Sequence, residues 1–108
     1  MTEALQILGL ARRAGAVAPG TAATRRSISQ GEARVVLMAE DASSAQLDKI
    51  RRTMRKRIIP QVLLGNRATL GAAIGKAPIT AVAVTDASLA GRLLESIDGE
   101  IMVDEGRD

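Results

Sequence analysis

The sequence predicts a single α/β domain, a three-layer α/β/α sandwich around a small, mixed and largely parallel four-stranded sheet. Two stretches, 33–39 and 79–85, are nearly unbroken apolar runs with β-branched residues, which is typical of strands covered on both faces. Segments with helical spacing of apolar residues alternate with the strand-like runs, which favours strands joined by helices. A chain of 108 residues, 46% of them hydrophobic, can bury its own core without a metal ion or a disulfide.

The first part of the chain is expected to form a helix and then an edge strand. Thr2 can cap a helix in which apolar residues recur at helical spacing, and Gly15 follows its basic end. The strand would cover residues 15–19. Pro19 places it at an edge of the sheet, because proline has no N–H to donate to a second neighbouring strand.

Three helices are expected in the second part of the chain. Their expected starting points are Ser43 or Ser44, the turn at Gly65 and Asn66, and Asp86. A further strand is expected at 58–64, with an irregularity at Pro60. Gly99 is expected to end the last helix, so that residues 1–98 form one domain and residues 99–108 form an acidic, mobile tail.

Charge is distributed unevenly along the chain. The net charge is +3, but residues 1–76 carry +8 and residues 77–108 carry −5. Twelve of the fifteen cationic residues are arginine, whose planar guanidinium pairs with phosphate through two hydrogen bonds. This pattern favours a nucleic-acid partner. The chain has no aromatic residue on which a base could stack, so arginine, backbone and small residues would have to make the contacts.

Several classes of function are excluded by what the chain lacks. It has no Cys and no His, which removes thiolate nucleophiles, Ser-His-Asp triads and almost all zinc sites. The glycines before Lys76 match neither the GxxxxGK[ST] nor the GxGxxG spacing, and the adjacent Glu40 and Asp41 would diverge rather than pair. We therefore expect no enzyme activity, no metal and no cofactor. The absence of a long apolar run and of a signal-peptide pattern predicts a cytoplasmic protein without a membrane partner.

The segment from Gly20 to Gly31 is the main candidate binding element. It reads as a short helix in which Gly20 allows close approach to the backbone and Thr21 is the expected N-cap. Helical spacing gives the helix a core side with Thr24 and Ile28 and an open side with Ala22, Arg25, Arg26 and Ser29. Backbone N–H groups beside Arg25 and Arg26 would suit a phosphate or an RNA backbone. The alternative is an ordinary solvated surface helix.

Further cations could extend this footprint. They are Arg12, Arg13, Arg51, Arg52, Arg55 and Lys56. Each of these groups stands near the end of an expected helix, so the alternative is that they only complement the helix dipole at a solvated surface. The sequence leaves open whether the basic groups lie on one face.

Four segments together resemble a known family. They are LGLARRAG at 8–15, PGTAATRR at 19–26, ARVVLMAEDAS at 33–43, and LGAAIGK at 70–76 followed by ITAVAVTD at 79–86. They are similar to the kink-turn RNA-binding ribosomal-protein superfamily of the L-seven-Ae and L-thirty-e type, in particular its bacterial YlxQ-like branch. The resemblance covers about residues 3–97 and implies the same sandwich. It also implies structured RNA, such as ribosomal RNA, as the partner, with the ribosome or a fused YlxR-type domain as further partners.

The resemblance also implies where RNA would bind. The family's Asn-Glu pair and its following Lys fall on Ala22, Ala23 and Arg26, and its second RNA-facing loop falls on Gly75, Lys76, Ala77 and Pro78. The two alanines have no polar group with which to read a base edge. We therefore expect a non-enzymatic binder of structured RNA, with relaxed specificity, that holds phosphates through the backbone of Gly20–Ala23 and through nearby cations. The alternative is a protein-interaction or ribosome-associated scaffold module that has lost kink-turn recognition.

Overall fold

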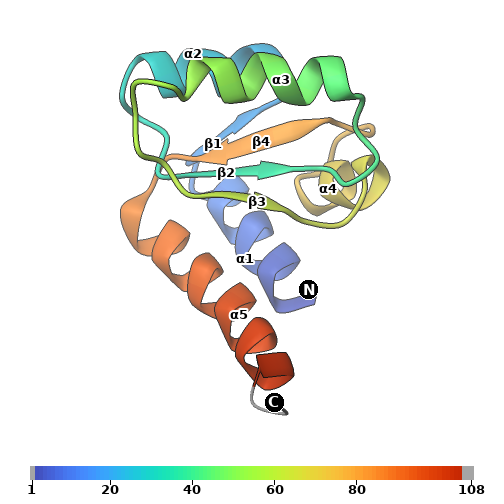
Figure 1. Ribbon diagram of the computed structural model, residues 1–108. Coiled ribbons are helices and arrows are strands. Elements are labelled where there is room, and N and C mark those ends of the chain that lie inside the picture. Colours follow the sequence, from blue (N-terminus) through green and yellow to red (C-terminus); the bar gives the residue numbers. More distant parts are fainter. Residues whose placement is uncertain (1, 106–108) are drawn as a thin grey trace.

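The computed structural model describes residues 2–105, and side chains within it for residues 3–97 (Figure 1). The helices are α1 (Thr2–Arg13), α2 (Thr21–Ser29), α3 (Ser44–Thr53), α4 (Arg67–Ala73) and α5 (Ala87–Glu105). The strands are β1 (Val17–Pro19), β2 (Val35–Met38), β3 (Gln61–Leu63) and β4 (Ala81–Val84). The predicted α/β/α sandwich with a mixed four-stranded sheet is confirmed: α2 and α3 cover one face, and α1, α4 and α5 cover the other (Figure 1).

The sheet has the strand order β1-β4-β2-β3. Strands β1, β2 and β3 run in one direction, but β4 lies antiparallel between β1 and β2, so only the β2–β3 pairing is parallel. The expectation of a largely parallel sheet is therefore wrong, because two of the three strand pairings are antiparallel. The direction of β4 follows from where the chain enters it, after the seven-residue helix α4. The chain then folds back, with the Ile79 N–H donating to the Arg67 carbonyl, and enters β4 from the end at which β2 and β3 finish.

Alternation along the two central strands builds the two halves of the core. In β2, Val35 and Leu37 pack toward α1, α4 and α5, whereas Val36 and Met38 pack toward α2 and α3. All residues of β2 and β4 are buried, as their unbroken apolar runs predict. Each helix layer therefore rests on its own apolar cluster, and the sheet is shared between them.

The edge strands differ from the sequence-based expectation in one place. Strand β1 is an edge strand, as Pro19 predicts. The strand expected at 58–64 is shorter, because β3 begins at Gln61; Pro60 has no N–H, and Ile58 before it is fully exposed. β3 forms the opposite edge, where Leu63 is 47% exposed.

Two expected helix ends are also corrected. The N-cap of α2 is Gly20 and not Thr21, since the chain enters the helix with a positive φ of 91° that glycine adopts without strain. Helix α5 does not end at Gly99 but continues to Glu105. A single glycine costs a helix only about 1 kcal/mol, and no proline follows it. The mobility expected for residues 99–108 stays a prediction, and residues 106–108 lie outside the described residues.

The packing of Gly71 gives a prediction about stability. A Cβ atom on Gly71 would lie 2.2 Å from the Ala77 carbonyl oxygen and 2.8 Å from its carbon. Gly71→Ala must displace that backbone, and we expect a loss of about 1–3 kcal/mol in unfolding free energy, measured by urea denaturation with far-UV circular dichroism.

Gly91→Ala is the matched control, because a Cβ atom on Gly91 in α5 would meet no atom within 4 Å. It should raise stability by about 0.5–1 kcal/mol through helix propensity alone. Equal effects of the two substitutions would contradict the close contact at Gly71.

Candidate nucleic-acid interface

The N-terminus of α2 lies at the end of the sheet where β1 finishes and β4 begins. The Gly20 N–H donates to the Ala81 carbonyl at 2.8 Å, and Pro19 is paired with Val82. Residues 75–80 lead into β4 at this same end. The structure therefore places the beginning of α2 beside the end of the α4–β4 loop, two regions that lie more than fifty residues apart in the sequence.

Helix α2 begins without a side-chain cap. Its first helical hydrogen bond runs from the Thr24 N–H to the Gly20 carbonyl at 2.9 Å, and among the described side chains none accepts from the N–H groups before it. By contrast, α3, α4 and α5 begin with side-chain acceptors, supplied by Ser43, Asn66 and Asp86. Free N–H groups at a helix start carry a partial positive charge, so the first turn of α2 is suited to hold an anion such as a phosphate.

The outer face of α2 carries one cation close to this N-terminus. Ala22 and Arg26 are both exposed and lie one helical turn apart on the same face, whereas Ala23 is partly buried. Arg25 is directed elsewhere: its Nε donates to Thr53 Oγ1 at 3.0 Å and ties α2 to the last residue of α3. Arg26 is thus the arginine of the pair that is more open to a ligand at the helix start.

A buried polar contact fixes α2 on the sheet. Thr24 is fully buried, and its Oγ1 donates to the Ala18 carbonyl in β1 at 3.2 Å. Ile28, one turn further on, is fully buried against β2 and α3. The orientation of the exposed face of α2 therefore depends on Thr24 and Ile28 on its opposite side.

The α4–β4 loop is held by its own backbone. Gly75 has a positive φ of 68°, and the Lys76 N–H donates to the Gly71 carbonyl at 2.9 Å. The next turn brings Ala77 against Gly71, and the Thr80 carbonyl accepts from the Ala39 N–H at 2.8 Å. Lys76 and Ala77 are exposed on this closely packed loop, so the loop presents one cation on a defined backbone path.

The other basic residues fall into two separate places. Arg12 lies beside the loop, with its guanidinium carbon 3.7 Å from the position of a Cβ atom on Gly75. The second group follows the other end of α2, because the neighbouring Arg57 donates from Nη2 to the Ser29 carbonyl at 3.0 Å. This group contains Arg51, Arg52, Arg55 and Lys56 on and after the last turns of α3. The basic residues therefore do not form one face.

Two carboxylates limit the basic surface on the side of β2 and β3. Glu40 follows β2 and is exposed, and its N–H donates to the Gly65 carbonyl. Asp41 Oδ1 accepts from the Arg67 N–H at 2.8 Å, and Arg67 Nε lies 3.8 Å from Asp41 Oδ2. Asp41 is thus neutralised locally, whereas Glu40 is a repulsive neighbour for a phosphate placed near it.

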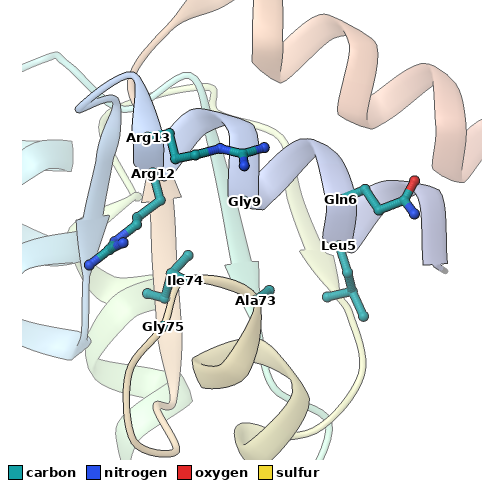
Figure 2. A pocket seen from close by; sticks show the side chains of 8 residues that line it. All are labelled: Leu5, Gln6, Gly9, Arg12, Arg13, Ala73, Ile74 and Gly75. Carbon is teal, nitrogen blue, oxygen red and sulfur yellow. The ribbon is translucent and has the colours of Figure 1, made fainter.

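Sequence reasoning missed a groove between α1 and α4 (Figure 2). Its volume is about 350 Å³, and it is lined by Leu5, Gln6, Gly9, Arg12, Arg13, Ala73, Ile74 and Gly75. Gly9 was the available signal, since a glycine inside a helix often marks a close approach. A Cβ atom on Gly9 would lie 3.2 Å from the Ala73 carbonyl oxygen, so the glycine permits the two helices to meet.

The described residues 3–97 contain no group of three or more acidic, His or Cys side chains placed to hold a metal ion. In the described part of the chain, no helix is both long and apolar enough to span a membrane.

The mixed sheet between two helix layers, with the start of α2 beside the loop before β4, defines a small three-layer α/β/α domain. The sequence profile of the ribosomal protein L7Ae/L30e/S12e/Gadd45 family matches residues 2–93, and the chain belongs to this family. It is 36% identical to the RNA-binding protein YlxQ of Bacillus subtilis (strain 168) over 96 residues, which are 89% of this chain and 96% of that protein. The predicted family is therefore confirmed. Because this is a non-enzymatic RNA-binding family, the family also supports the expectation that the chain is not an enzyme.

Two solved structures share the fold. A Bacillus halodurans protein of unknown function superposes with a TM-score of 0.84 and 31% identity, over 91% of this chain and 99% of that one. The Giardia lamblia 15.5kD RNA binding protein superposes with a TM-score of 0.71 and 18% identity, over 92% and 84% of the two chains. The second similarity shows the fold alone.

The contact that anchors α2 gives a second prediction. Thr24→Val keeps the shape of the buried side chain but removes its hydrogen bond to the Ala18 carbonyl, so we expect a loss of about 0.5–1.5 kcal/mol in unfolding free energy. Thr21→Val in the same helix is the control, since no hydrogen bond joins the Thr21 hydroxyl to another described side chain or backbone group. Urea denaturation of both variants checks the prediction, and an unchanged Thr24→Val protein would contradict it.

Proposed function

We propose that this protein binds structured RNA, of the kink-turn or ribosomal type, through the start of α2 and the α4–β4 loop. The observation that carries the proposal is the uncapped N-terminus of α2 next to the loop that leads into β4. The proposed contacts are Gly20, Thr21, Ala22, Ala23, Arg25, Arg26, Gly75, Lys76 and Ala77. The alignment with the RNA-binding protein YlxQ of Bacillus subtilis covers nearly the whole length of that protein, and this similarity supports RNA as the ligand.

The groups in this proposed site are suited to bind phosphates rather than to read bases. The backbone N–H groups of the first turn of α2, with Arg26 and Lys76, would hold phosphates and supply affinity that falls with salt. Ala22 and Ala23 contribute backbone but no side-chain group that could read a base. Each missing base contact gives up about 1–3 kcal/mol of discrimination, so the proposed specificity is weaker than that of a family member with polar side chains there.

The cellular setting is part of the proposal. A basic, non-enzymatic domain of a ribosomal-protein family is suited to ribosomal or other structured RNA in the cytoplasm. The ribosome itself and a fused YlxR-type domain stay predictions from the resemblance. A role in RNA binding also stays a prediction for Arg51, Arg52, Arg55 and Lys56. These residues lie beyond the other end of α2 and would contact only an RNA that extends along the helix.

One observation favours a second candidate function, a protein-interaction module. Ile58 is fully exposed directly after Arg57 and two residues after Lys56, and it precedes the open edge strand β3. An exposed isoleucine beside cations suits an acidic protein segment with an apolar side chain. Capture of a protein partner that survives nuclease treatment and is lost in Ile58→Asp would support this function.

The main test is a titration of two fluorescently labelled RNAs. One carries a kink-turn, and the other is the same stem with its sheared G·A pairs replaced; label on the RNA is needed because the protein has no aromatic residue. We expect both to bind, with a modest preference for the kink-turn and a steep decrease as salt rises. Absence of binding to either RNA at low salt would overturn the proposed function.

The two arginines of α2 should behave differently. Arg26→Ala removes an open cation near the proposed phosphate site, so the slope of log K against log salt should decrease by about 0.7–0.9. Arg92→Ala removes the same charge from an exposed position on α5 and should leave the slope unchanged. Arg25→Ala should have an intermediate effect and lower stability slightly, since it breaks the bond to Thr53. Equal slopes for Arg26→Ala and Arg92→Ala would exclude Arg26 from the site.

A further inference from the structure

The groove between α1 and α4 has a one-sided charge. Arg12 and Arg13 line it at the C-terminal end of α1, and none of the described residues that line it is acidic. Leu5 and Gln6 lie at its other end, two helical turns away (Figure 2). Its lining therefore offers cations and an amide without a competing carboxylate, which is the composition expected for an anionic ligand.

The positions of the arginines suit an extended ligand better than a compact one. Figure 2 shows their side chains diverging from the end of α1, with Arg12 on the side of Gly75 and Arg13 along the helix. Gly75 has no side chain to block the approach to Arg12. Two guanidinium groups that point apart over an open groove can each hold one phosphate of a passing strand.

Arg12 and Arg13 stand in the last turn of α1, where their charge complements the helix dipole. Two carbonyls near Gly75 already accept from backbone donors: the Gly71 carbonyl from Ile74 and Lys76, and the Ala72 carbonyl from Gly75. In the part of the chain with described side chains, no hydrogen bond or ion pair joins Arg12 or Arg13 to another group. This contrasts with Arg57 and Arg67, which are engaged in holding α2 and Asp41.

The groove continues the proposed RNA site. Gly75 belongs to the groove, and the next residue, Lys76, is the exposed cation of the α4–β4 loop. The loop then enters β4, whose first residue, Ala81, accepts from Gly20 at the start of α2. One backbone path therefore connects the arginines of α1 with the N-terminus of α2.

We propose that this groove is a second phosphate-binding site, which holds two successive phosphodiesters of the same RNA through Arg12 and Arg13. The inference rests on the proposed function and extends its footprint across the loop onto α1. In this arrangement the RNA strand passes from the first turn of α2, over Lys76, and along the groove. The contacts are independent of base sequence, because the groove is reached by the backbone of the strand.

The test compares two double variants with the kink-turn RNA as probe. Arg12→Ala with Arg13→Ala should lower affinity on the order of tenfold at low salt and reduce the salt slope by about 1.4–1.8, the value for two lost phosphate contacts. Lys49→Ala with Arg92→Ala removes the same total charge from exposed positions on α3 and α5 and should leave the slope unchanged. The loss should be equal for the kink-turn RNA and its control stem, since no base contact is removed.

The outcomes separate this inference from the proposed function. If the wild-type protein binds RNA and Arg26→Ala weakens binding, but the Arg12 and Arg13 variant keeps the wild-type slope, the groove is not a phosphate site and the main site stands. If the wild-type protein binds no RNA, both proposals fail. Thermal unfolding of each variant is measured in parallel; should the alanine variant be unstable, Arg12→Gln with Arg13→Gln keeps the side-chain stems and must give the same loss of slope.

Discussion

The antiparallel insertion of β4 between β1 and β2 is the constraint on which the rest of the structure depends. It joins β1 to the rest of the sheet, and β4 contributes residues to the apolar clusters on both faces. It also determines which segments lie at the end of the sheet that holds the candidate site, because a strand that runs against its neighbours must be entered where they finish. The loop before β4 and the N-terminus of α2 are neighbours for this reason, and the hydrogen bond from the Gly20 N–H to the Ala81 carbonyl joins them.

Much of the fold could be predicted from the sequence because its signals are local. The unbroken apolar runs identified β2 and β4, and Ser43 and Asp86 identified two helix starts. The direction of β4 could not be predicted, because an apolar run reveals that a strand is buried but not which strands flank it. Gly20 rather than Thr21 caps α2 because the backbone enters from β1 at a positive φ, which is a property of the path and not of the residue types.

The candidate site was only partly accessible from sequence. Resemblance to the family located the start of α2 and the loop at Lys76, but it could not show that Arg25 is bonded to Thr53 while Arg26 is open. The groove depends on Gly9 and Ala73, which are distant in sequence and meet only when α4 packs across α1. Charge alone was a poor guide for a related reason, since some arginines of this basic chain stabilise helices and turns.

The contact between Gly71 and Ala77 has a consequence for how this surface can recognise a ligand. The backbone of Ala77 packs directly against Gly71, which has no side chain to separate the two segments. The position of the exposed Lys76 is therefore determined by the path of the backbone. We expect such a closely packed loop to lose little conformational freedom on association. In the proposed RNA-binding role, this surface would act as a preformed template, which selects RNA by its shape rather than by closing around it.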